Sequence, residues 1–352
     1  FMMSDKQKKF GIAGILFVIL AVAFYFLYWT KTPVYSINLI REAWQNHDTV
    51  TFQQRVDMDR LYNKAFDDYI KAQETITGEK ITDIPLAAGL LEMLKPAVVN
   101  KLKTETLNAI TEQSAKVETD KQSDRQDQLA KNMQEKANAK DNVVRDVSTV
   151  SQEGKAAIVA ITLHNSKLDR DFKLNVTMNE LDDGTWKLIE VANLTDFLIE
   201  VDKAEKEKLA ELNKPIIEEL NKSLQITGGQ MNLNNDGNPF FTSYWLSSNA
   251  TFNNASAKDI NAFAYKIKID ESKGGPTLAT YNVSSSLQIP KGQSGTDYRR
   301  IDLNQFKDTD NSVIGCNFSS TNLTIEITKI EFADGSKLEL LTKVPDVTSI
   351  KK

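Results

Sequence analysis

An uncharged apolar run near the N-terminus constrains this chain of 352 residues more than any other feature. Residues Phe10 to Trp29 contain no charged residue and no proline, and about 20 apolar helical residues suffice to cross a hydrocarbon core of about 30 Å. The run ends in aromatic residues, which favour the headgroup level. We therefore predict an uncleaved transmembrane helix over residues 10–29. The alternative is a cleaved signal peptide, whose apolar region would be shorter and would precede a small-residue cleavage site.

Lysines on the two sides of this run predict its orientation. Three lysines precede the run within residues 1–9, whereas only Lys31 follows it closely. Positive residues tend to stay on the cytoplasmic side, so we expect a cytoplasmic N-terminus and a chain that lies outside the cytoplasm after Lys31. The single cysteine, Cys316, permits no intramolecular disulfide, which favours a bacterial envelope protein over a secreted eukaryotic one. The expected location is the bacterial cytoplasmic membrane, crossed once.

The composition indicates a folded body behind the anchor. Apolar residues make up 41% of the chain and charged residues 26%, which are values typical of globular proteins. Roughly 320 residues beyond the membrane exceed what one core usually accommodates, so two domains are expected. The net charge is −5, and no basic stripe occurs outside the N-terminal lysines. Nucleic acid is therefore excluded as an expected partner.

The pattern after the anchor is first helical and then strand-like. Pro33 suits the first turn of a helix, and apolar residues recur at helical spacing as far as Ile110. Apolar residues almost vanish over 116–142, which predicts a solvated polar insert, with a partner-binding helix as the alternative. From Val143 the period becomes two, and four consecutive strands are predicted, with a hairpin turn at Asp183-Gly184. We expect an α+β domain over residues 32–200.

The remaining chain predicts a connecting helix and a second domain. Asn193 is expected to cap a bridging helix over 193–224, kinked at Pro215. Residues 225–352 alternate as short strands separated by turn residues, which is typical of an autonomous β-sandwich. The tripeptide Gly228 to Gln230 is expected to form a turn at the start of this domain. The predicted fold class is thus α+β: a transmembrane helix, a domain of helices with an antiparallel sheet, and an all-β sandwich.

Several stretches resemble known families. The order Asp48, Phe52, Val56 and Asp57, after a short helix that follows an anchor, resembles a family of bacterial membrane-anchored proteins of unknown function, although the polar insert departs from that pattern. The stretch "DDGTWKLIEVANL" resembles the last hairpin of cone-like α+β domains of the cystatin or nuclear-transport-factor-2-like kind. Residues 225–352 resemble immunoglobulin-like modules of bacterial envelope proteins, which mostly bind other molecules or act as spacers. These resemblances imply a location and a fold, and they transfer no catalytic residue.

Residues that could carry chemistry are few. The only histidines, His47 and His164, show no zinc-binding spacing, and Cys316 is interpreted as a small buried residue rather than a nucleophile. Asp236 lies in a loop that begins like a calcium site, but Ser243 stands where a bidentate glutamate is needed. Asp57 and a neighbouring aspartate are interpreted as surface ion-pair residues rather than an acid–base pair. No enzyme activity, cofactor or metal is predicted.

Two functions of different classes remain. The first is a non-catalytic, membrane-anchored envelope component that binds, spaces or assembles with a protein partner of unknown identity. The alternative is a carrier or sensor that holds a small apolar ligand in the α+β domain. Four aromatic residues are the candidates to line such a pocket, namely Trp44, Phe52, Phe66 and Trp186.

Overall fold

The computed structural model describes residues 25, 27–111, 128–133, 141–238 and 242–346. Most of the predicted membrane-spanning run lies outside these residues, and none of the helices within them is long and apolar enough to cross a membrane. The chain divides into two compact units, which we treat one at a time. The first comprises Phe1–Lys206 with Pro345–Lys352, and the second comprises Glu207–Val344.

Three helices of the first unit begin at side chains that cap helix N-termini. They are α2 (Pro33–Gln45), α3 (Thr49–Arg55), α4 (Met58–Thr77) and α5 (Pro85–Ile110), with the 3₁₀ turns η1 (Trp29–Lys31) and η2 (Ile81–Asp83) before α2 and α5. The side chains of Thr32, Asp48 and Asp57 each accept a hydrogen bond from the backbone N–H three residues later, at 3.2, 2.9 and 3.1 Å. These three residues therefore cap α2, α3 and α4.

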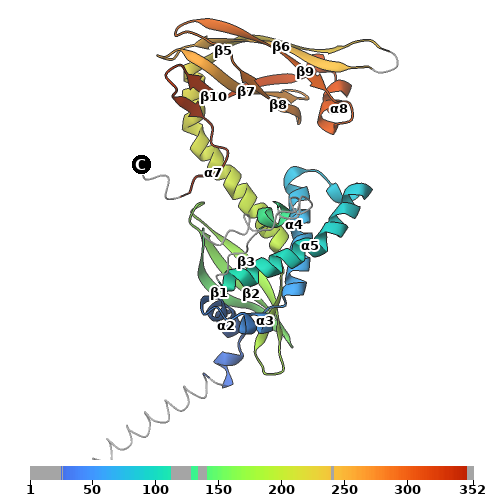
Figure 1. Cartoon of the computed structure of the whole chain (residues 1–352), viewed down its shortest axis with the longest axis vertical. Coiled ribbons are helices and arrows are strands. Elements are labelled where there is room, and N and C mark those ends of the chain that lie inside the picture. The colour runs from blue at the N-terminus through green and yellow to red at the C-terminus, as the bar shows by residue number, and fades with distance from the viewer. Residues whose placement is uncertain (1–24, 26, 112–127, 134–140, 239–241, 347–352) are drawn as a thin grey trace, which may run out of the picture. The chain divides into compact units, whose positions relative to one another are not determined.

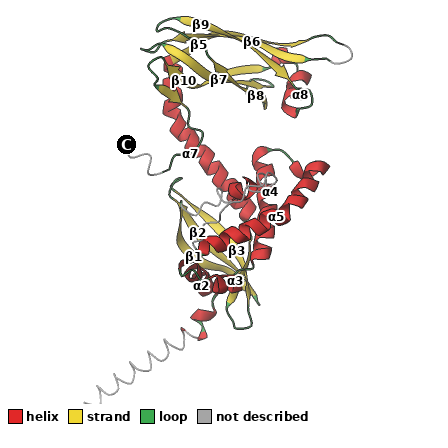
Figure 2. Cartoon of the chain, in the orientation of Figure 1, coloured by secondary structure: helices red, strands yellow, loops and turns green. Residues whose placement is uncertain are grey.

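The four strands predicted from Val143 onward are confirmed. They are β1 (Asn142–Glu153), β2 (Ala156–Asn165), β3 (Arg170–Glu180) and β4 (Trp186–Val191), paired antiparallel in sequence order. The predicted hairpin turn between β3 and β4 is also confirmed, because Gly184 has φ 77° and donates its N–H to the carbonyl of Leu181 at 2.8 Å. The helices of this unit lie against the sheet (Figure 2), and Val56 forms a single parallel bridge with Leu188 of β4.

The core of the first unit lies between its helices and one face of its sheet. One buried cluster is helical and contains Ala43, Phe52, Val56, Met58 and Ile110. Another lies on the sheet and contains Ala157, Val159, Val176, Met178 and Trp186. Ile40 of α2 and Leu188 of β4 pack against both clusters. Together with the antiparallel sheet, these helices make the unit an α+β structure.

A helix of 30 residues, α7 (Leu194–Ser223), carries the chain from the first unit into the second and continues through Pro215. Asn193, which was expected to cap this helix, uses its side chain differently. Its Oδ1 accepts the N–H of Asn175 at 2.8 Å, and its Nδ2 donates to the carbonyl of Lys173 at 3.0 Å. Asn193 therefore fastens the start of α7 to strand β3. Of the predicted polar insert 116–142, residues 128–133, which are helical, and residues 141–142 are described.

The second unit contains two antiparallel sheets, which Figure 1 shows stacked. One has the order β5-β6-β9 and the other β11-β10-β7-β8. The strands are β5 (Leu224–Asn235), β6 (Tyr244–Asn254), β7 (Ile260–Asp270), β8 (Thr277–Ser285), β9 (Ser294–Leu303), β10 (Asn322–Phe332) and β11 (Lys337–Glu339); helix α8 (Asp308–Gly315) and turn η3 (Phe318–Ser320) precede β10. Phe252 of β6 packs against Phe263 and Tyr265 of β7, with ring centroids 4.7 and 5.2 Å apart, and these rings join the two sheets.

The expected turn at Gly228 to Gln230 is wrong. These residues lie inside strand β5 and pair with Thr251, Ala250 and Asn249 of β6. The glycines indicated a turn because they accept unusual backbone angles, but pairing with β6 decides the local conformation. The core of this unit also takes in Leu220 and Leu224, both fully buried, which precede residue 225.

Candidate functional site

The residues that follow the predicted anchor are bound directly to the sheet of the first unit. We call this contact the base joint and define it by Lys31, Ser36, Asp183, Thr185 and Trp186. Its central side chain is Trp186, which is only 1% exposed. The indole Nε1–H of Trp186 donates to the carbonyl of Lys31 at 2.8 Å, and its backbone N–H donates to the buried Oγ of Ser36 at 2.9 Å.

The side chain of Lys31 makes a second link across the base joint. Its Nζ donates to the carbonyl of Asp183, and its Cδ lies 3.0 Å from the position that a Cβ on Gly184 would occupy. Only glycine fits here without movement, because the position combines a positive φ with this close approach. The turn between β3 and β4 is thus shaped around the first residues after the predicted anchor.

Asp183 is the charged member of the base joint. One of its carboxylate oxygens accepts the N–H of Thr185 at 2.9 Å, and the other lies 3.3 Å from Nη2 of Arg55. Nη1 of the same arginine donates to the Thr185 hydroxyl. The hydrogen bonds from Thr185, and then the Arg55 guanidinium, lower the pKa of Asp183 to about 2. The carboxylate therefore stays ionised at all physiological pH values and holds the turn closed.

Exposed apolar side chains stand immediately before the base joint. Leu27 and Tyr28 are 78% and 62% exposed, and Tyr25 and Trp29 are also classed as exposed. Tyr25 reaches α2, where its ring meets that of Tyr35 edge to face at 6.4 Å between centroids. Large apolar groups in such a cluster are suited to an interface between water and lipid.

The structure separates the four aromatic residues predicted to line a pocket. Trp44 and Phe52 lie together, with ring centroids 5.9 Å apart, but Phe52 is buried in the helical core and Trp44 is 44% exposed. Trp186 belongs to the base joint. Phe66 lines a cavity of about 410 Å³ beside α4 and α5, together with polar residues such as Asp67 and Glu92.

A smaller cavity in the first unit is mostly apolar. Its volume is about 200 Å³, and its lining comes from α4, α5, the helical residues 128–133 and the start of α7. The lining side chains are Tyr62, Ala65, Tyr69, Leu102, Thr106, Met133, Leu194 and Leu198. The hydroxyl groups of Tyr62 and Thr106, two of the polar groups in the wall, hydrogen-bond to each other. None of the four predicted aromatic residues lines this cavity, because the spacing of α4 turns Phe66 to another face.

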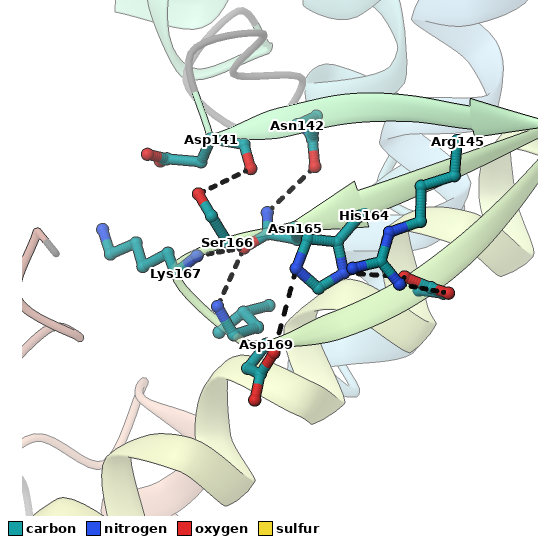
Figure 3. Close-up of polar contacts among 10 residues, drawn as sticks. Asp141, Asn142, Arg145, His164, Asn165, Ser166, Lys167 and Asp169 are labelled. Carbon is teal, nitrogen blue, oxygen red and sulfur yellow. Dashed lines mark hydrogen bonds and ion pairs between the residues drawn. The ribbon is translucent and has the colours of Figure 1, made fainter.

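A polar cluster around His164 lies at the end of the β2–β3 hairpin (Figure 3). Nδ1 of His164 lies 2.7 Å from Oδ1 of Asp171, whose carboxylate also meets Arg145 at 3.0 Å. The hydrogen bond from His164 and the charge of Arg145 lower the pKa of Asp171. In the adjoining loop, Oδ1 of Asn165 accepts the N–H groups of Lys167 and Leu168. These contacts fix the hairpin end.

The contacts of His47, Cys316 and Asp236 indicate structural roles for these residues. Nδ1 of His47 meets the carbonyl of Ile110, far along the chain from His164 and its partners. Within the described ranges, no three histidine, cysteine, aspartate or glutamate residues form a group that could hold a metal ion. Burial raises the pKa of the Cys316 thiol, which is opposite to the activation of a nucleophile. Asp236 accepts the N–H groups of Asn238 and Ser243, both at 3.1 Å, within its own loop.

Comparisons with known proteins add little to this description. No family model and no curated protein match the chain. A solved structure titled "X-ray structure of Northeast Structural Genomics Consortium target SoR45" covers 34% of this chain and 80% of its own, with 11% identity and a TM-score of 0.21. A TM-score of this size supports no argument about fold or function.

Proposed function

We propose that this protein is a non-catalytic, membrane-anchored component of a bacterial envelope that binds or positions a partner protein. The observation that carries the proposal is the base joint. A protein that searches for soluble substrates gains reach from a flexible tether, whereas in this chain no flexible linker separates the apolar run from the folded unit. Lys31 is bound to the sheet through its carbonyl and its side chain, and Thr32 already caps α2.

The exposed residues before η1 agree with this arrangement. If 10–29 spans the bilayer, Tyr28 and Trp29 lie at the headgroup level, and the turn at Asp183 lies next to them through its bond with Lys31. The β3–β4 turn then faces the membrane. The β2–β3 loop lies at the opposite end of the same sheet, about 35 Å away for a strand of this length.

Fluorescence quenching by lipid-attached groups tests this placement. In full-length protein with Cys316→Ala, a single fluorophore is attached either at Asp182→Cys, in the turn, or at Ser166→Cys, in the opposite loop. Both native side chains are exposed. After reconstitution into vesicles whose lipids carry a quencher near the headgroup, we expect strong quenching at position 182 and little at position 166. Equal quenching at the two positions, or none at either, contradicts the proposal.

Lengthening the tether tests whether the rigid connection matters for function. A flexible Gly/Ser segment inserted between Trp29 and Thr30, just after the predicted span, leaves every contact of the base joint in place. The same segment inserted after Lys31 separates Lys31 from Ser36 and the rest of α2 along the chain. In a strain that lacks the gene, we expect both variants to be folded and membrane-bound but to complement poorly. Full complementation by the insertion before Thr30 would show that position above the membrane is unimportant.

A carrier of a small apolar ligand is the second candidate, and the cavity of about 200 Å³ favours it. Cavities of about 150 Å³ with apolar walls bind benzene-sized molecules. Naphthalene serves as the probe, and binding is followed as a rise in the melting temperature of the full-length protein. Ala65→Leu fills the cavity and should abolish the rise, whereas Asn63→Leu, on the exposed face of the same helix, should retain it. No rise in the unchanged protein removes this candidate.

A further inference from the structure

Strand β5 is a long, uncharged sheet edge. It forms one margin of the sheet β5-β6-β9, most of its side chains are exposed, and none of its 12 residues is charged. Open edges invite pairing by other chains, so proteins commonly protect them with charges or bulges. The opposite margin, β9, carries Asp297, Arg299, Arg300 and Asp302, and β1 in the first unit has two register shifts and several charges. β5 has one register shift but lacks the protective charges.

Strand β10 of the other sheet has an open edge of its own. Its partner β11 pairs only with Lys329, Ile330 and Glu331. Along Asn322–Ile327, no strand within the described part of the chain pairs on the edge that lies away from β7. Leu323 is 39% exposed there. β11 is thus too short to cover β10, and a stretch of about six residues lacks a neighbour.

The two open edges face each other across a groove. This groove has a volume of about 500 Å³ and is lined by Ile226–Met231 of β5, Ser248 and Asn249 of β6, Ile267 of β7 and Leu323–Ile325 of β10. None of these residues is charged. Gly229 pairs with the buried Ala250 and so lies on the inner face of its sheet, where it contributes no side chain to the wall. Gly229 therefore leaves the groove open beside the backbone of β5.

The chemistry of the groove selects its occupant. Unpaired backbone N–H and C=O groups along β10 are satisfied best by an extended backbone, and glycines in a strand allow another backbone to approach closely. The occupant needs one free edge, which pairs with β10. The unpaired stretch of β10 is about six residues long, which suits a short extended segment. The uncharged lining also disfavours a charged segment.

We propose that the groove between β5 and β10 binds one extended, uncharged segment of another protein, which pairs with β10 along Asn322–Ile327 in the place that a longer β11 would fill. Alternate side chains of the segment enter the groove over Ile267. This inference goes beyond the proposed function, because it concerns the second unit alone and does not depend on the anchor. A failure here would leave the base joint and its tests unaffected.

Peptide selection on the full-length protein in detergent tests the proposal. The probe is a displayed library of random 11-residue peptides, and the selected peptides are then synthesised for affinity measurements. We expect sequences without charge or proline at their centre and with apolar residues at alternate positions. N-methylation of alternate backbone amides on one edge should weaken binding about tenfold or more, whereas N-methylation of the intervening amides should have a smaller effect.

Lysine substitutions locate the binding. Met231→Lys places a charged side chain into the groove from β5, and Leu323→Lys does the same from β10. Each should weaken the selected peptides about tenfold or more. The control is Gly315→Lys at the end of α8, where a Cβ meets nothing within 4 Å; it should bind as the unchanged protein does. Circular dichroism and thermal unfolding verify that each variant is folded. If one of the two groove variants does not fold, the other still tests the groove.

Three results would overturn the proposal. Peptides without alternation, or with affinities that N-methylation leaves unchanged, would show that backbone pairing is not the mode of binding. Affinities unaffected by both Met231→Lys and Leu323→Lys would place the peptides elsewhere. Self-association of the full-length protein that Met231→Lys abolishes would assign the groove to a second copy of this chain.

Discussion

Removing the second half of α7 from the second unit should largely unfold that unit. Leu220 and Leu224 are 0% exposed and belong to its buried cluster, against which Ile216 also packs. The side chain of Asn213 adds two hydrogen bonds to the backbone of Leu341, one donated at 3.0 Å and one accepted at 2.8 Å. A fragment that begins at residue 225 loses all these contacts, although its strands beyond Leu224 remain.

The expected loss is large compared with the stability of a domain. Replacing one fully buried leucine by alanine typically costs about 2–5 kcal/mol, so the absence of Leu220 and Leu224 alone costs about 4 kcal/mol or more. Domains of this size are stable by about 5–15 kcal/mol. We therefore expect the fragment 207–344 to unfold in one cooperative transition and the fragment 225–344 to be unfolded or only marginally stable.

Urea denaturation measures the difference, followed by far-ultraviolet circular dichroism and by the fluorescence of Trp245, the only tryptophan in residues 207–344. Within the longer fragment, Leu220→Ala should lower the free energy of unfolding by about 3 kcal/mol. Ile217→Ala, on the exposed side of the same helix, should lower it by less than about 1 kcal/mol. If fragment 225–344 is as stable as fragment 207–344, the helix is not part of this core and the reasoning fails.

Three further substitutions test single contacts. The pKa of Asp183 is about 2 in the folded protein and 3.8 in the unfolded chain, so its contribution to stability is complete above pH 4 and is lost as the pH falls towards 2. Asp183→Asn should therefore reduce the protection of the turn amides from hydrogen exchange by about 1 kcal/mol at pH 7, allowing for the 55% exposed side chain. At pH 2 the same substitution should have little effect. Gly184→Ala should lower the melting temperature more than Gly154→Ala, since both have positive φ but only Gly184 contacts Lys31. Tyr265→Phe removes a buried 2.9 Å hydrogen bond to Asp297 and should cost about 1.5–3 kcal/mol in urea denaturation; a smaller cost would show that Asp297 is satisfied by its other donors.

Local patterns predicted much of this fold. A period of two over residues 143–191 predicted the four strands, and Asp183-Gly184 predicted a hairpin, because both signals depend on neighbours in the sequence. The same kind of reasoning wrongly predicted a turn at Gly228. Glycine favours turns locally, but the pairing of β5 with β6 extends through this residue. Asn193 directly precedes α7, as predicted, and its carbonyl accepts the N–H of Phe197, but its side-chain amide binds β3, which helix-capping rules do not consider.

The sites were harder to predict because they join residues that are distant in the sequence. Trp186 and Lys31 are separated by 155 positions, and no local sequence pattern near either residue predicts their hydrogen bond. The four aromatic residues share a chemical type, and their spacing along the chain does not decide which faces they occupy. The groove in the second unit depends on an absence, the short length of β11, which is visible only once the strand order is known.

The strand orders of the two units also imply different folding kinetics. The sheet of the first unit pairs only consecutive strands, joined by short turns, so each step closes a small loop and can be fast. In the second unit, Thr251 pairs with Thr296, 45 residues later, and Ile267 must wait for Ile325. A chain made from its N-terminus would therefore complete the first sheet while β7 still lacks β10. During that interval one edge of β7 has no partner, and this is the stage at which the protein is most vulnerable to aggregation by strand pairing.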